Sequence, residues 1–176
     1  MAGCLSCGEG SNVSPESVRR WTHKLSNVLL SATARKKFHE YLVSREFADG
    51  AKLLEFWEKC NDFIAQAETT KHHSRGWKRK SPEKKTRSHT SGAQKYHKTT
   101  LKDEAQRIVQ FADSYINFDR AQMEALKSAV ESGDDKTIVT AITEVKQAAA
   151  EMLEDEGYHA FCQNLLTEQG LLKEGN

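Results

Sequence analysis

Two cysteines near the N-terminus are the first side chains whose spacing could do chemistry. Cys4 and Cys7 form Cys-Leu-Ser-Cys, which is half of a zinc-ribbon pattern. The other half is missing, because Cys60 and Cys162 are isolated in helix-like apolar patterns typical of small buried hydrophobes. Two interpretations of Cys4 and Cys7 therefore stay open: a disordered tail, or S-acylation that tethers the chain to a membrane.

Residue patterns that would indicate catalysis are missing. The sequence holds no Gly-rich phosphate loop, no nucleophile-elbow pattern and no His-x-x-x-His zinc pair. Four of the seven histidines lie in one basic stretch, where solvated imidazoles suit neither a metal site nor a general base: His72, His73, His89 and His97. We expect no catalytic residue, no metal and no cofactor.

Charge is unevenly distributed along the chain. Residues 71–102 hold 11 of the 26 Lys and Arg and one of the 25 Asp and Glu, so a strongly basic block lies inside an acidic body. The candidate anion-binding residues are Lys78, Arg79, Lys80, Lys84, Lys85 and Arg87. A solvated loop, attraction to an anionic membrane and nucleic-acid binding all remain open, and nucleic acid is the least favoured of the three.

The rest of the chain has the composition of one globular domain. No apolar run exceeds three residues, whereas a membrane-spanning helix needs roughly 20. The N-terminus lacks the basic start and apolar stretch of a secretory signal. We therefore expect an intracellular, monomeric protein.

Helical spacing dominates the elements that would position any site. Ser14-Pro15-Glu16 predicts a helix start, and Val18, Trp21, Leu25 and Val28 follow at spacings of three and four. The clearest stripe comprises five apolar residues on one helix face. Its members are Leu53, Phe56, Trp57, Cys60 and Ile64.

The second half of the chain has the same character. Thr100 and Asp103 predict a capping box, and a helix over 119–131 is broken by Gly133. A long helix is expected to end near Gly157, followed by a short last helix. The fold class is all-α, with seven to nine helices and a long loop over roughly 68–101.

Several motifs in order resemble the RGS domain, the module of regulators of G-protein signalling. They are Val13–Trp21, Arg45-Glu46-Phe47, Leu54-Glu55-Phe56-Trp57, Tyr115-Ile116-Asn117-Phe118-Asp119, and Met152–Tyr158 followed by Phe161. The resemblance covers residues 13–172, leaving tails at 1–12 and 173–176. It places the basic insertion, 68–101, between the family's fourth and fifth helices.

The resemblance implies a nine-helix bundle that binds the switch regions of a GTP-loaded G-protein α subunit. Such a domain accelerates GTP hydrolysis without being an enzyme itself, because the α subunit supplies the catalytic Gln and Arg. Asn117 matches the family Asn that approaches that Gln. The other family contact positions are occupied by Glu46, Leu53, Met152, Glu156 and Ala160. A cytoplasmic location, peripheral at the inner plasma membrane, is the corresponding expectation.

Departures from the family pattern support one alternative to acceleration. Leu53 stands where the family has a second contact Asn (Ala51 does so in the other register), and Ala160 stands where many members have Arg. These losses favour a non-catalytic RGS-like scaffold that binds another protein. The third hypothesis is electrostatic binding of membrane or nucleic acid through the basic loop.

Overall fold

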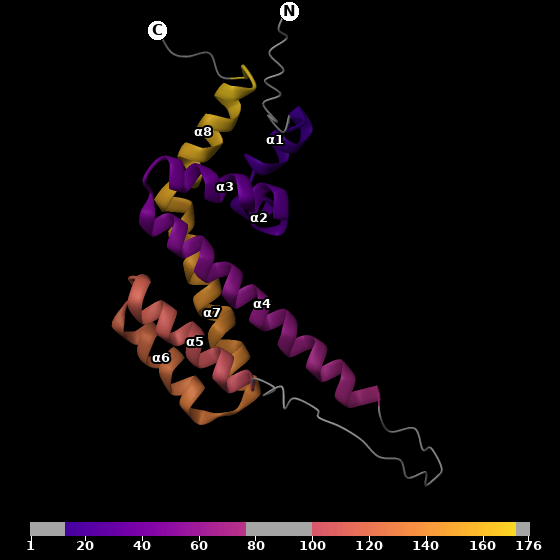
Figure 1. Ribbon diagram of the computed structural model, residues 1–176, viewed down its shortest axis with the longest axis vertical. Coiled ribbons are helices and arrows are strands. Elements are labelled where there is room, and N and C mark those ends of the chain that lie inside the picture. The colour runs from indigo at the N-terminus through magenta and orange to yellow at the C-terminus, as the bar shows by residue number, and fades with distance from the viewer. Residues whose placement is uncertain (1–12, 77–99, 172–176) are drawn as a thin grey trace, which may run out of the picture. The chain divides into compact units, whose positions relative to one another are not determined.

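A computed structural model describes residues 13–76 and 100–171 of the chain. These residues are all-helical, and none of them forms a strand (Figure 1). The elements in chain order are α1 (Pro15–Trp21), α2 (Leu25–Leu30), α3 (Ala32–Ser44), α4 (Ala48–Gly76), α5 (Leu101–Tyr115), α6 (Arg120–Ser132), α7 (Asp135–Leu153), a π-helical turn (Glu154–Tyr158) and α8 (His159–Glu168). The predicted fold class is therefore confirmed at the level of an all-α protein.

The chain divides into two compact units. Unit 1 comprises residues 13–48 and 154–171 of the described part, and unit 2 comprises residues 49–153 without the gap. The domain predicted over 13–172 includes residues of both units. The loop also begins later than expected, because α4 continues to Gly76 and residues 68–76 are helical. The predicted tails and the rest of the basic insertion up to residue 99 lie outside the described residues.

Unit 1 begins with the expected cap. The Ser14 hydroxyl accepts a hydrogen bond from the Ser17 amide at 3.3 Å, with Pro15 at the first helical position. The predicted apolar series is split, since α1 stops at Trp21 and α2 restarts at Leu25. The four apolar residues of that series remain buried. The Thr22 amide closes the last turn of α1 by donating to the Val18 carbonyl at 2.9 Å.

The core of unit 1 joins α3 to α8. The rings of Phe38 and Phe161 lie 4.9 Å apart, and both side chains are fully buried. Gly157, expected to end the long helix, lies instead inside the π-helical turn that links α7 to α8. A Cβ at Gly157 would be 2.7 Å from Leu42 Cδ2 on α3, so only glycine allows this close approach.

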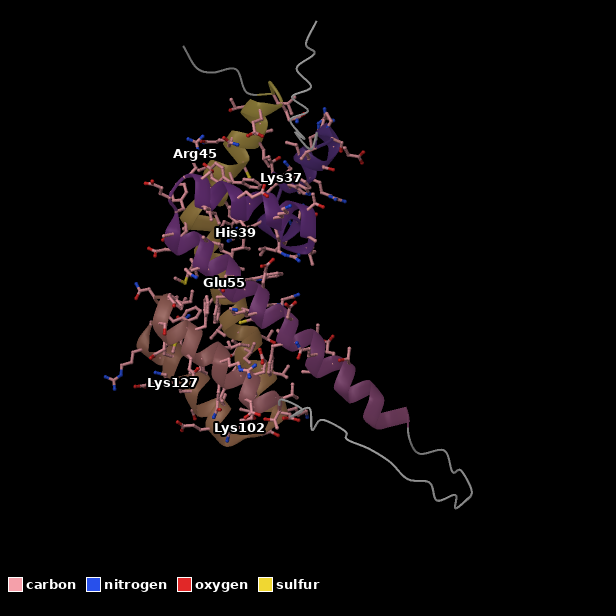
Figure 2. All side chains as sticks on the ribbon, in the orientation of Figure 1. Lys37, His39, Arg45, Glu55, Lys102 and Lys127 are labelled. Carbon is pink, nitrogen blue, oxygen red and sulfur yellow. The ribbon has the colours of Figure 1, made fainter. Side chains whose placement is uncertain are left out.

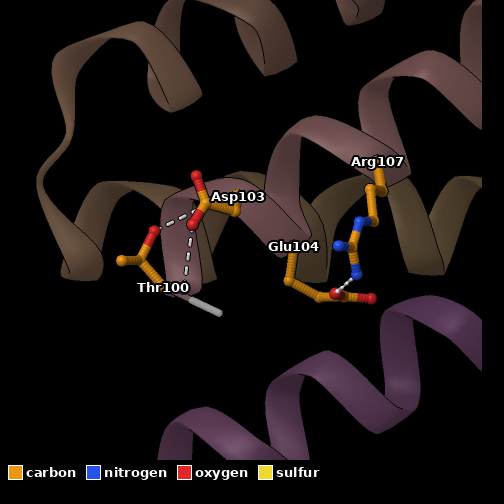
Figure 3. Close-up of polar contacts among 4 residues, drawn as sticks. All are labelled: Thr100, Asp103, Glu104 and Arg107. Carbon is orange, nitrogen blue, oxygen red and sulfur yellow. Dashed lines mark hydrogen bonds and ion pairs between the residues drawn. The ribbon is translucent and has the colours of Figure 1, made fainter. Parts of the chain in front are cut away.

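Unit 2 contains α4 to α7. The predicted capping box is confirmed: Asp103 donates its amide to the Thr100 hydroxyl at 3.1 Å, and Thr100 donates its amide to the Asp103 carboxylate at 3.0 Å (Figure 3). Gly133 ends α6 in the left-handed conformation at φ 69°, as the break in the pattern predicts.

The predicted α4 stripe is correct at four of its five positions. Leu53, Phe56, Trp57 and Cys60 are buried, whereas Ile64 is half-buried and Phe63 takes its place in the core. No described helix combines the length and apolarity that crossing a membrane requires.

Candidate partner-binding site

A short loop between α5 and α6 presents Asn117 to solvent. Ile116 and Asp119 have extended backbone, and side chains alternate along such a segment. Ile116 and Phe118 are accordingly buried at 7 % and 8 % exposure, whereas Asn117 between them is exposed. The alternation therefore leaves the Asn117 amide free to donate and accept hydrogen bonds.

Both ends of this loop are fixed by hydrogen bonds. The Ile116 amide donates to the Ala112 carbonyl at 2.9 Å and closes the last turn of α5. At the other end, the Gln122 amide donates to the Asp119 carboxylate at 2.8 Å, and the Asp119 amide donates to the Gln122 side chain at 3.1 Å. This second capping box starts α6 immediately after the loop.

Aromatic packing in the core of unit 2 also holds the loop in place. The Phe118 ring meets the Phe56 ring edge-on at 5.4 Å, and Phe56 stacks on Phe111 at 6.2 Å. Phe56 belongs to the predicted Leu54–Trp57 motif and Phe118 to the predicted Tyr115–Asp119 motif. Two motifs that are remote in sequence thus meet within unit 2.

Glu46 occupies a tight corner between α3 and α4 in unit 1. It is exposed and has φ 61°, the only positive φ of a non-glycine residue in the described ranges. The corner is closed by hydrogen bonds from the Phe47 amide to the Leu42 carbonyl and from the Ala48 amide to the Glu46 carbonyl, both 2.9 Å. The backbone that carries the Glu46 carboxylate is therefore fixed in a conformation that is uncommon for residues other than glycine.

The neighbours of Glu46 support the same corner. The Phe47 ring stacks on Tyr41 at 6.3 Å, and the Arg45 guanidinium lies 5.8 Å from the Tyr41 ring centre. Arg45 also donates to Asn164 Oδ1 on α8 at 3.4 Å. Figure 2 labels Arg45 in unit 1.

The remaining predicted contact residues fall on the stretch from α7 to α8. Met152 and Ala160 are half-buried, and Glu156 is exposed in the π-helical turn. Glu156 stands between Asp155 and Gly157, so this turn presents a carboxylate. The backbone is kinked here, because Gly157 has non-helical angles of φ 166° and ψ −9°.

Leu53 does not fit its predicted role. Its side chain is 3 % exposed, so it belongs to the core and offers no surface to a partner. Ala51, the alternative position, is half-buried and has no polar side-chain atom. The position where the family has a second Asn therefore carries no polar contact in either register.

The five remaining contact candidates divide between the two units. Glu46, Glu156 and Ala160 belong to unit 1, and Asn117 and Met152 belong to unit 2. The other predicted sites, Cys4, Cys7 and the cations Lys78, Arg79, Lys80, Lys84, Lys85 and Arg87, lie outside the described residues. In the ranges that are described, no three His, Cys, Asp or Glu are grouped to hold a metal ion.

Two surface features were not predicted. A groove of about 440 Å³ runs between α3 and α8, lined among others by Lys37, Tyr41, Arg45 and Asn164. The other is Tyr115, the last residue of α5, which is 55 % exposed. Neither feature has a sequence signal, because spacing identifies a helix face and not what covers it.

Lys52 connects the exposed Tyr115 to α4. Its ammonium lies 4.8 Å from the Tyr115 ring centre and 2.9 Å from Glu55 Oε2. Partial burial alone raises the pKa of Glu55, but the hydrogen bond from Lys52 and the charges of Lys52 and Lys59 lower it overall. Glu55 is labelled in Figure 2.

Comparison with protein-family models, with curated proteins and with solved structures found no match to this chain.

Proposed function

We propose that this protein regulates heterotrimeric G-protein signalling by binding the switch regions of a GTP-loaded α subunit. In this proposal it accelerates GTP hydrolysis by stabilising the transition-state arrangement. The observation that carries the proposal is Asn117, an exposed amide between two buried neighbours on a loop fixed at both ends. It lies in the Tyr115–Asp119 motif, which resembles a segment of the RGS domain.

The proposed mechanism needs no bond-making by this chain. The α subunit supplies the Gln that orients water and the Arg that stabilises developing charge. An amide presented by a rigid loop can donate to and accept from the Gln segment at once, and so favours the one switch conformation in which hydrolysis occurs. Because Asn117 is already positioned, little conformational entropy is lost on binding.

Two exposed carboxylates would supplement Asn117. Glu46 and Glu156 each lie on a tight corner, at φ 61° and in the π-helical turn respectively. Carboxylates accept strong hydrogen bonds from backbone amides and from Lys or Arg on a partner. Met152 and Ala160 would each supply less polar contacts to the partner, Met152 from unit 2 and Ala160 from unit 1.

Single-turnover GTP hydrolysis tests this proposal directly. Asn117→Ala should reduce the acceleration by roughly tenfold or more, because one hydrogen-bonding group in a closed interface contributes about 1–3 kcal/mol. Gln106→Ala, which removes an exposed amide from the middle of α5, is the matched control and should leave the rate unchanged. No acceleration by the wild-type protein across a panel of α subunits would refute the proposal.

A non-catalytic scaffold is the second candidate, favoured by the burial of Leu53. A surface without the second polar contact could bind an α subunit or another protein without selecting the transition state. Pull-downs with α subunits in GDP, GTP-analogue and transition-state-mimic forms separate the two. Preference for the transition-state mimic supports acceleration, and equal capture of the three forms supports the scaffold.

A further inference from the structure

One ion pair bridges α5 and α6 beside the loop that carries Asn117. Lys127 Nζ on α6 lies 2.6 Å from Asp113 Oδ1, two residues before the end of α5. The other ion pairs recorded in the described ranges join residues three or four apart, within one helix. This contact therefore closes the helical hairpin across the loop.

The charge of Lys127 offsets an unfavourable electrostatic interaction of Asp113. A carboxylate in the last turn of a helix meets the negative end of the helix dipole, which disfavours it. Its side chain is 59 % exposed and that of Lys127 is 44 % exposed, so neither is held by burial. Without Lys127, the last turn of α5 would carry an uncompensated repulsion directly before Ile116 and Asn117.

We infer that Asp113 and Lys127 are positioning residues that fix the direction in which the α5–α6 loop presents Asn117. This inference rests on the proposed function and assigns to it two residues that make no contact with the partner. The buried Phe118 and the Asp119 capping box hold the C-terminal side of the loop. The ion pair supplies the matching restraint on the N-terminal side, where α5 ends.

A second lysine provides a matched control. Lys102 also joins the two helices, since its Nζ donates to the Glu131 carbonyl at 3.4 Å. That contact lies in the first turn of α5, at the opposite end of the hairpin from Asn117. Figure 2 labels both lysines, Lys102 and Lys127. Lys102→Met thus removes a cation that connects the same helices away from the loop.

The first measurement is single-turnover GTP hydrolysis at saturating regulator. Asp113→Asn and Lys127→Met should each lower the maximal acceleration by about 1.5-fold to fivefold, the range expected for an exposed ion pair. The double variant should be no worse than either single variant, and the reversed pair D113K/K127D should restore the wild-type value. Lys102→Met should leave it unchanged. Unaltered rates in both single variants, or an equal loss in Lys102→Met, would overturn the inference.

The second measurement does not depend on the proposed function. Amide hydrogen exchange at Asn117 and Phe118 should be faster in Asp113→Asn and Lys127→Met, and unchanged in Lys102→Met. If the wild-type protein accelerates no α subunit, the proposed function fails while the exchange data still decide the role of the ion pair. Loop exchange that is the same in all four proteins contradicts that role.

Discussion

The hydroxyl of Tyr158 donates a 2.9 Å hydrogen bond to the carbonyl of Trp21, in the buried part of unit 1. The bond joins the π-helical turn to the last residue of α1, where helix carbonyls have no partner within the helix. Burial is the main cause that raises the pKa of Tyr158, so this hydroxyl remains a donor over the whole physiological range.

Tyr158→Phe should lower the free energy of unfolding by about 1–3 kcal/mol, because it leaves the Trp21 carbonyl buried without its donor. Urea unfolding measures the difference. Tyr115→Phe is the control: it also removes one hydroxyl, but from a side chain that is 55 % exposed, and should change stability by less than about 0.5 kcal/mol. Equal effects of the two variants would contradict the importance of the bond.

Gly157→Ala should destabilise the protein by about 1–3 kcal/mol, because the new Cβ would lie 2.7 Å from Leu42 Cδ2. Leu42→Ala alone should cost about 2–5 kcal/mol through the cavity it leaves. The double variant should lose clearly less stability than the two single losses added together, because the space left by Leu42→Ala can hold the new Cβ at residue 157. Strict additivity in thermal or urea unfolding would show that the two groups do not meet.

Asp103→Ala should cost about 1 kcal/mol, because it removes one half of the capping box that starts α5. Figure 3 also shows the neighbouring pair of Glu104 and Arg107, joined at 2.8 Å across one turn of the same helix. Glu104→Gln breaks this ion pair within one helix and should cost no more than about 0.5 kcal/mol. Comparable losses in circular-dichroism melts of the two variants would argue against the cap.

The buried Cys60 thiol should make the folded protein less stable at alkaline pH. Burial raises the pKa of its thiol from 9.0 to about 12, against a smaller opposing effect of the Lys146 charge. The Cys60 thiol ionises above about pH 9 in the unfolded chain but stays protonated in the folded one. The contribution of this thiol to folding stability is therefore fully present below pH 9 and is lost between pH 9 and 12.

The measurement for Cys60 is urea unfolding of the wild type and Cys60→Ala between pH 7 and pH 10. The difference in unfolding free energy between the two proteins should be constant up to about pH 8. Between pH 9 and pH 10 the wild type should lose about 1 kcal/mol of stability relative to Cys60→Ala. A difference that stays constant to pH 10 would show that the folded thiol titrates normally.

Much of the local structure is predictable from the sequence. The caps at Ser14 and Thr100 and the break at Gly133 follow from contacts within a few residues. Asn117 could also be nominated from the motif around it. These features are local, because a capping side chain or a glycine acts on the backbone one turn away.

Exposure of the site residues was decided by tertiary structure. Leu53 and Tyr115 both lie on helices, in α4 and α5, yet Leu53 is 3 % exposed and Tyr115 is 55 % exposed. The turn around Gly157 likewise packs against Leu42, which is distant in sequence, and the last residue of α1, Trp21, accepts a hydrogen bond from Tyr158. Spacing along a helix selects a face, whereas burial of that face requires a second element, and only the folded chain determines which residues meet it.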